Sequence, residues 1–269
     1  MSAAPLEPAR ERAGRAGDSG PIGDNAAPVI QATLAQVGME LRLLSRRGEN
    51  LFVTVVVPLV LLVFFSIVPT VAQGGVTFVL PGILALAIIA TSLVNLGIST
   101  AFERSYGVLK RLGGSPLPRG GLIAAKMTTV ALVEVGQVVV LIVVAATVFG
   151  WAPGPGASAA ICLAGFVLGT LAFSGLGLLL AGALRAEATL AIANGLFLIL
   201  LLLGGIVLPV DHLPPVLADV ARVLPAAALA DALRIGLGGA SGDALGSLGV
   251  LAIWAALTTG LAARTFRWE

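Results

Sequence analysis

Charged residues are scarce in this chain of 269 residues: they make up 11% of it, against roughly a quarter of an ordinary soluble domain. Apolar residues make up 58%, which is more than a soluble protein of this length can bury. Together these values exclude a secreted domain, a disordered chain and an ordinary cytosolic enzyme. They indicate a polytopic membrane protein whose solvent is mostly lipid.

Cysteine and histidine are nearly absent, with one of each, Cys162 and His212. A disulfide framework is therefore excluded, and neither a metal site nor a Ser/His/Asp or Cys/His catalytic set is expected. The sequence also has no G-x-x-x-x-G-K-[ST] phosphate loop, so it lacks the usual means of binding and hydrolysing ATP. We expect no enzyme activity and no cofactor in this chain.

Six long apolar stretches are each able to cross a hydrocarbon core of roughly 30 Å as a helix. Their runs are unbroken, which favours helices over the short alternating strands of a transmembrane barrel. The fourth stretch is crowded with small residues, which favours close contact between helices. The predicted fold is all-α with six transmembrane helices, at Leu51–Ala72, Val76–Ala101, Leu122–Phe149, Ala157–Leu184, Thr189–Val210 and Ala244–Ala263.

The positive charges are distributed unequally over the loops between these stretches. Of the sixteen Lys and Arg residues, only Arg222 and Arg234 fall on the side opposite the termini. The positive-inside rule then predicts a multi-pass protein of the cell membrane with both termini in the cytoplasm. Residues 1–28 are predicted to be a disordered cytoplasmic tail, and residues 29–269 a single transmembrane domain.

Residues 29–50, before the first stretch, have the spacing of an amphipathic helix. Apolar residues recur at steps of three and four on one face, while Gln36, Glu40, Arg46 and Arg47 lie on the other. This pattern predicts a helix on the cytoplasmic membrane surface, with its arginines near lipid phosphates. An alternative is a simple extension of the first span. The apolar face contains Ile30, Leu34, Val37, Leu41 and Leu44.

The loop 102–121, between the second and third stretches, is strongly basic. Phe102–Leu112 is predicted to form a short helix that ends at Gly113 and Gly114. A short basic helix tied to two spanning helices can pass a push from a soluble partner into the membrane. The alternative is a positive-inside anchor with a turn.

The segment 208–243, between the fifth and sixth stretches, is long and is predicted to be external. Leu213–Leu224 and Ala226–Leu237 are expected to form short helices that dip into the outer leaflet or lie on it. Asp231 and Arg234 are three residues apart on one helical face, so they are expected to pair. The prolines that separate the pieces are Pro209, Pro214, Pro215 and Pro225.

Two motifs resemble those of type-2 ATP-binding-cassette exporter permeases, the membrane subunits of drug, polysaccharide and teichoic-acid exporters. The run of residues 103–117 is similar to the family's "E-R-x-x-G-x-L-x-x-L-x-x-S-P-L", which forms the helix that docks on the ATPase. The external prolines and the D-A-L-R of 231–234 resemble the family's second signature. On this resemblance the ATPase-coupling residues are Glu103, Arg104, Gly107, Leu109, Lys110, Arg111 and Leu112.

The resemblance also implies the partners of the chain. A separate cytoplasmic ATPase subunit, in two copies, would bind ATP and Mg, and a second permease chain, identical or related, would complete the pathway. Membrane lipids are expected to contact the chain, and nucleic acid is not an expected partner. The implied function is export of a hydrophobic or amphiphilic substrate: a drug, a lipid or a lipid-linked glycan.

Glu134 lies inside the third stretch, where a charge is expensive. It is either a polar point of the translocation path or a helix contact, or it reaches the cytoplasmic interface by snorkelling. Gln137, Asn95 and Asn194 are its candidate partners. Two other functions remain open: a proton-coupled secondary transporter that uses Glu134, and a membrane scaffold that transports nothing.

Overall fold

The computed structural model describes residues 29–46, 48–68, 75–112, 118–206, 210 and 213–265, and these residues form helices without strands. The predicted all-helical class is therefore confirmed. The helices are α1 (Val29–Arg46), α2 (Gly48–Ile67), α3 (Gly75–Ile89), η1 (Ala90–Asn95), α4 (Leu96–Ser105), α5 (Val108–Leu112), α6 (Arg119–Phe149), α7 (Ala159–Ala183), α8 (Ala186–Leu203), α9 (Pro215–Val223), α10 (Pro225–Gly236) and α11 (Ala244–Thr265).

Five continuous helical segments of the described chain are long and apolar enough to cross a membrane. They match the second to sixth predicted stretches, although the fifth ends at Leu203 instead of Val210 because a turn begins at Gly204. The second is one rod in which η1, a single stretch of π-helix, joins α3 to α4. The spans are Gly75–Ser105, Arg119–Phe149, Ala159–Ala183, Ala186–Leu203 and Ala244–Thr265.

The first predicted span, Leu51–Ala72, is only partly described. Its apolar helix runs from Phe52 to Ile67, which is shorter than the other five. This helix carries Pro58 in its interior, so the carbonyl of Thr54 loses its usual partner in the helix. The described residues therefore contain five helices long enough to span and a shorter apolar one.

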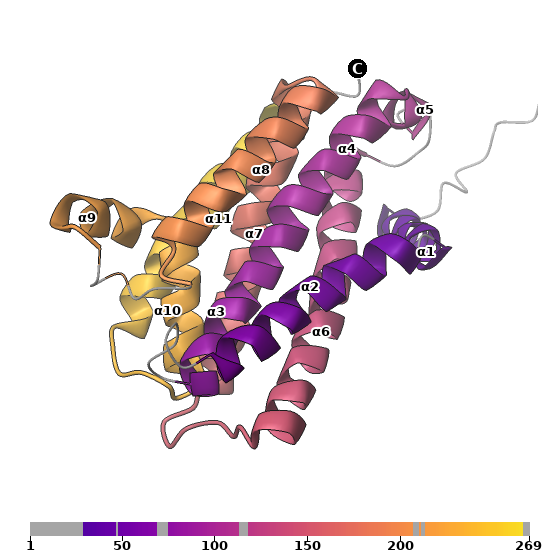
Figure 1. Cartoon of the computed structure of the whole chain (residues 1–269). Coiled ribbons are helices and arrows are strands. Elements are labelled where there is room, and N and C mark those ends of the chain that lie inside the picture. Colours follow the sequence, from indigo (N-terminus) through magenta and orange to yellow (C-terminus); the bar gives the residue numbers. More distant parts are fainter. Residues whose placement is uncertain are drawn as a thin grey trace, which may run out of the picture.

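Helix α7 lies at the centre of the bundle and contacts α11, α10, α4 and η1 (Figure 1). Glycines permit these contacts. A Cβ at Gly177 would lie 2.8 Å from the carbonyl oxygens of Ser92 and Leu93, and one at Gly175 would lie 2.5 Å from the hydroxyl of Thr258. The expectation that small residues of this span bring helices close together is confirmed.

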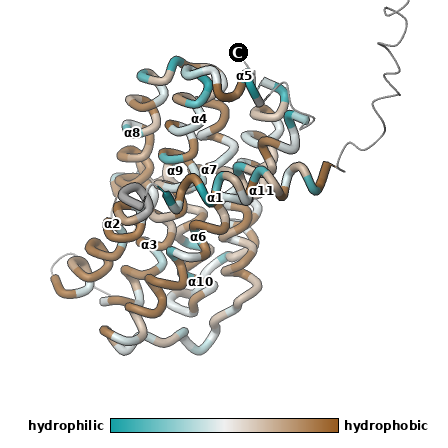
Figure 2. Tube along the Cα trace, turned by 90° about the vertical axis from the view of Figure 1, so that its right-hand side faces the viewer, coloured by the Kyte–Doolittle hydropathy of each residue, from teal (hydrophilic) through white to brown (hydrophobic). Residues whose placement is uncertain are grey.

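The two ends of the bundle differ in polarity. Helix α5 and the C-terminal end of α11 lie at one end, here called the basic end, which carries Lys110, Arg111 and Arg264 (Figure 1). Figure 2 shows hydrophilic residues gathered at this end and along α1, while the helices below it are largely hydrophobic. Residues 150–158 and the end of α10 meet at the opposite end through backbone hydrogen bonds from Gly154 to Leu237 and from Ser158 to Gly236.

Two short helices follow α8, close to their predicted positions. Helix α10 is buried among α3, α7 and α11, because its alanines let the three helices surround it. Twelve residues span about 18 Å, too little to cross a bilayer. Helix α9 is more exposed: its Ala218 and Ala221 face the protein, whereas Val216 and Val223 do not.

Several sequence-based predictions lie outside the described residues. They concern the tail 1–28, Arg47, the segment 113–117 with Pro116, and Pro209. For Leu112 only the backbone is described, and His212 and residues 266–269 are not.

We predict that Gly177→Ala lowers the melting temperature of the purified protein. The added methyl group meets backbone atoms of η1 and α4, and overpacking of this kind costs about 1–3 kcal/mol. Gly195→Ala is the matched control, because a Cβ there meets nothing within 4 Å. Thermal unfolding in detergent measures both, and equal melting temperatures for the two variants would contradict the packing argument.

Candidate functional site

The predicted helix 102–112 is two helices joined by a turn, and the prediction of one continuous helix is wrong. Helix α4 ends at Ser105, and α5 begins at Val108. Between them Gly107 has φ +70°, a left-handed conformation that glycine adopts without strain. The turn sets α5 at an angle to the spanning rod, so α5 projects at the basic end (Figure 1).

One face of α5 and its turn is exposed and carries both charge and an aromatic ring. Lys110 and Arg111 are exposed, and Tyr106 keeps 73% of its surface accessible. Leu109, in contrast, is fully buried against Leu122 and Ile123 of α6. The apolar contact holds α5 on the bundle while the basic and aromatic face remains free to contact a soluble partner.

Glu103 and Arg104, the first two residues of the motif, point into the protein instead. The guanidinium of Arg104 donates to the carbonyl oxygens of Gly182 and Leu184, each at 2.5 Å, at the C-terminus of α7. These carbonyls have no partner within their own helix, and a cation there also suits the helix dipole. Glu103 accepts a hydrogen bond from Lys126 of α6 at 2.7 Å. Both residues therefore fasten the end of α4 to neighbouring helices.

Helix α1 forms as predicted, but its polar side does not all face water. Gln36 is buried, and Glu40 lies 3.4 Å from the ammonium of Lys126. The interpretation that both lie on a solvent side is wrong, because α1 packs against α6 along this side. Leu34 is 62% exposed and Leu41 is half-buried. Arg46 is exposed at the end of the helix.

Glu134 lies midway along α6 and is completely buried. Its carboxylate accepts hydrogen bonds from Ser92 of η1 and from Thr170 of α7, the latter at 2.5 Å. The carboxylate therefore links three helical segments. Because the side chain is inaccessible, the snorkelling alternative is wrong.

Gln137, one turn further along α6, fills the position that Pro58 leaves open in α2. Its amide nitrogen donates to the carbonyl of Thr54 at 2.7 Å, and its amide oxygen accepts from Thr91 of η1 at 3.1 Å. The amide nitrogen of Asn95 donates to the hydroxyl of Thr54 at 3.3 Å. We call Thr54, Thr91, Ser92, Asn95, Glu134, Gln137 and Thr170 the polar cluster.

The predicted partners of Glu134 are incorrect in their details. Gln137 and Asn95 belong to the same polar cluster but bond to Thr54, while Asn194 is exposed and donates to Leu190 in its own helix. Ser92 and Thr170 were missed, since hydroxyls at these positions follow no periodic signal. The requirement for a donor at the Thr54 carbonyl, in contrast, can be read from Pro58 alone.

Arg234 and Asp231 form the predicted pair near the opposite end, with 3.3 Å between the nitrogen and oxygen. The guanidinium also lies 4.4 Å from the ring centre of Phe78 on α3 and donates to the carbonyl of Gly205, after α8. Pro225 starts α10, and Pro214 stands directly before α9. Arg234 therefore fixes α10 to both neighbours.

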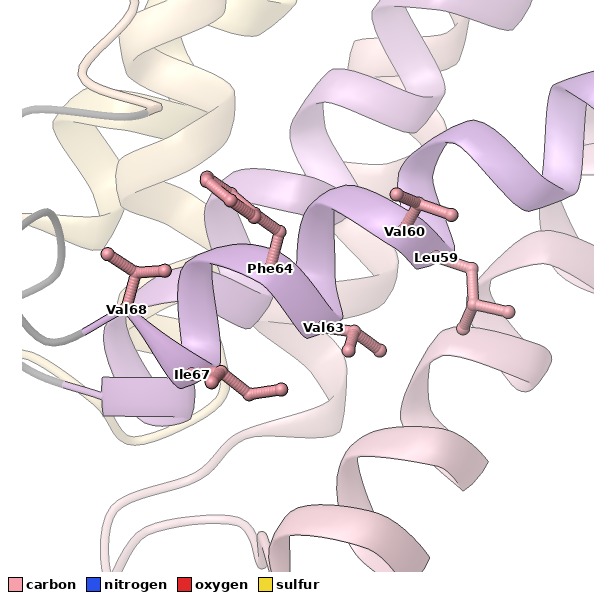
Figure 3. A pocket seen from close by; sticks show the side chains of 6 residues that line it. All are labelled: Leu59, Val60, Val63, Phe64, Ile67 and Val68. Atoms are coloured by element: carbon pink, nitrogen blue, oxygen red, sulfur yellow. The ribbon is translucent and has the colours of Figure 1, made fainter.

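Helix α2 has an open apolar hollow along its outer side, of about 390 Å³ (Figure 3). Its lining residues come from α2 and the residue that follows it, and none is polar, so the hollow suits an acyl chain or an apolar helix and not a charged ligand. The lining residues are Leu59, Val60, Val63, Phe64, Ile67 and Val68.

Comparison with known proteins gives one family. A family model described as ABC-2 type transporter matches residues 32–237. The match runs from α1 to the end of α10 and so includes both motifs described above. No curated protein matches the chain.

We predict that Thr170→Val lowers the melting temperature, because one oxygen of the buried Glu134 carboxylate loses its donor. The loss corresponds to about 1–3 kcal/mol. In a Glu134→Leu background the same change has a much smaller effect, since no carboxylate remains to be bonded. Thermal unfolding of the four proteins gives the coupling between the two sites.

The control is Thr147→Val, whose hydroxyl is exposed and donates only within α6. An unchanged effect of Thr170→Val in the two backgrounds would show that the hydrogen bond to Glu134 contributes nothing.

Proposed function

Because the chain belongs to the ABC-2 type transporter family, we propose that it is the permease subunit of an ATP-driven exporter. The observation that carries this proposal is α5, a short helix with an exposed basic and aromatic face at the end of an apolar bundle. The chain supplies the membrane pathway, and a separate cytoplasmic ATP-binding-cassette subunit supplies energy. ATP and Mg are bound by that subunit.

The proposed topology has six spans, with α2 as the first, both termini in the cytoplasm, and α9 and α10 in a re-entrant external segment. The basic end is cytoplasmic by the positive-inside rule. The twelve-residue length of α10 and its burial among spanning helices support re-entry, because a helix inside the bundle can end at membrane depth only where protein surrounds it.

The ATPase subunit binds the face formed by Tyr106, Lys110 and Arg111. An acidic surface on the partner would complement the two charges, which have no ion pair in the described part of the chain. Glu103 and Arg104 contribute from inside, by holding the end of α4 to α6 and α7. Two ATPase subunits and two permease chains, identical or related, form the complete exporter.

The substrate is a hydrophobic or amphiphilic molecule: a drug, a lipid or a lipid-linked glycan. The outer side of α2 supports this class, because its exposed Phe52, Val60 and Phe64 offer an apolar surface to lipid or to a second permease chain. The contacts of Glu134 favour a role in linking helices over a role in binding protons. Both of its oxygens are bonded to neighbouring helices, and its side chain is inaccessible.

We predict that the double variant Lys110→Glu/Arg111→Glu loses its ATPase subunit. Purification of the wild-type protein from native membranes in mild detergent is expected to recover an ATP-binding-cassette subunit with ATPase activity. The charge reversal reduces this recovery about tenfold or more, because like charges then face each other across the contact. Its melting temperature stays at the wild-type value, since both side chains are exposed.

Arg264→Glu is the control, an exposed arginine at the same end of the bundle but on α11. It should retain the subunit. Recovery of the wild-type protein alone, without ATPase activity, would overturn the exporter assignment and favour a scaffold or a secondary transporter.

A further inference from the structure

Lys126 of α6 is the meeting point of three helices at the basic end. Its side chain is 3% exposed and lies 2.7 Å from a carboxylate oxygen of Glu103 on α4 and 3.4 Å from one of Glu40 on α1. A buried ammonium needs partners of this kind, because lipid and apolar side chains cannot solvate it. We call these three residues the lysine triad.

The triad has an unequal charge balance, one cation between two anions. Removal of either carboxylate leaves Lys126 with one partner. Removal of the cation, in contrast, leaves two carboxylates facing each other without a counter-charge, and their repulsion acts to separate α1 from α4. The cation therefore determines how far apart the two helices lie.

Glu103 precedes Tyr106 by three residues, and Tyr106 is the first residue of the face that we propose binds the ATPase subunit. Its neighbour Arg104 holds α7 through Gly182 and Leu184, so the end of α4 is fixed on two sides. Beyond it the chain turns at Gly107 and continues into α5. A displacement of α5 therefore passes along the chain to the end of α4, where Glu103 and Arg104 lie.

An apolar cluster lies beside the triad and joins the same helices. Leu109 of α5 packs with Leu122 and Ile123 of α6, and Ala32 of α1 lies against this group. Lys126 follows Leu122 by one helical turn, so the apolar and ionic contacts lie on one side of α6. Helices α1, α4 and α6 are thus connected twice, once by this apolar cluster, which includes Leu96 of α4, and once by charge.

We propose that Lys126 is a positioning residue that makes α1 and the α4–α5 junction move as one unit. Glu103 receives the displacement of α5, Lys126 passes it across α6, and Glu40 passes it to α1. Helix α1 then follows the movement of the ATPase subunit, although α1 forms no part of the face that binds this subunit. This inference rests on the proposed function, since it assumes that a partner acts on α5.

The test measures the distance between spin labels at Ser45→Cys on α1 and Ser105→Cys on α4. Both positions are exposed, and Cys162→Ala removes the single native cysteine. Labelled chain is diluted with unlabelled chain, so that double electron–electron resonance detects only pairs within one molecule. The distance is recorded for the chain alone, and for its complex with the ATPase subunit with and without Mg-ATP and orthovanadate.

Four proteins are compared with the wild type. In the chain alone, Lys126→Met shifts the distance to longer values, whereas Lys126→Arg leaves it unchanged because the cation is retained. The triple variant Lys126→Met/Glu40→Gln/Glu103→Gln, in which no carboxylates repel, returns to the wild-type distance. Arg119→Met, which removes an exposed charge from the same helix, is the matched control.

The nucleotide measurement separates positioning from stability. In wild type and Lys126→Arg the distance stays the same when nucleotide is added, because the two helices move together. In the triple variant, which is folded but has no ionic link, nucleotide changes the distance. Where the triple variant does not give a monodisperse protein, Glu103→Gln replaces it in the nucleotide measurement, and its spin-label distance is also expected to change with nucleotide.

A nucleotide-dependent distance in the wild type, or a triple variant that behaves as the wild type with nucleotide, overturns the proposal. Failure of the proposed function is distinguishable, because then no ATPase subunit is recovered with any variant. Even so, the chain alone still reports whether Lys126 sets the distance between α1 and α4, and an unchanged distance in Lys126→Met overturns that role as well.

Discussion

The hydrocarbon interior of a membrane offers no hydrogen-bond partners, so every polar group on the long helices must find one within the protein. Pro58 makes this requirement acute, because it has no N–H to donate to the carbonyl of Thr54 within α2. Gln137 on α6 supplies the missing donor, and Thr91 satisfies the other end of that amide. Helix α2 packs along α3, and this hydrogen bond to one carbonyl links it to α6 as well.

The centre of the bundle depends on close backbone approach as well as on hydrogen bonds. Gly97 and Gly177 face each other, with 3.1 Å between a Cβ built on the first and the carbonyl oxygen of the second. This contact brings η1 and α4 against α7, which in turn places Ser92 and Thr170 within reach of one carboxylate. Small residues and polar residues therefore act together: the glycines set the distance between the helices, and the hydroxyls bond the buried carboxyl group of Glu134 at that distance.

The sequence predicted the helical class and six spanning helices, and five of these are long and apolar enough to span in the described chain, because long uncharged apolar runs favour helices in lipid. It also predicted the Asp231–Arg234 pair, since residues three apart on a helix are neighbours. It could not predict which way Glu103, Arg104 and Glu40 point. A charged residue at the end of a helix suits water, a partner protein or an internal ion pair equally well, and only the packing of α1, α4 and α7 distinguishes these cases. The break at Gly107 was missed for a related reason, because glycine permits a left-handed turn without requiring one.

The motif that resembles the family's ATPase-docking run combines two tasks in adjacent residues. Glu103 and Arg104 are internal and hold the end of α4, while Lys110 and Arg111 are exposed. This separation follows from the turn at Gly107, which ends α4 and sets α5 at an angle to it (Figure 1). Leu109 then anchors α5 on α6, so the exposed face is supported from behind. A force on α5 is thus resisted by rigid contacts instead of being lost in a flexible loop. That property requires each half of the motif to keep its own environment: Glu103 and Arg104 must stay bonded to neighbouring helices, and Lys110 and Arg111 must stay exposed.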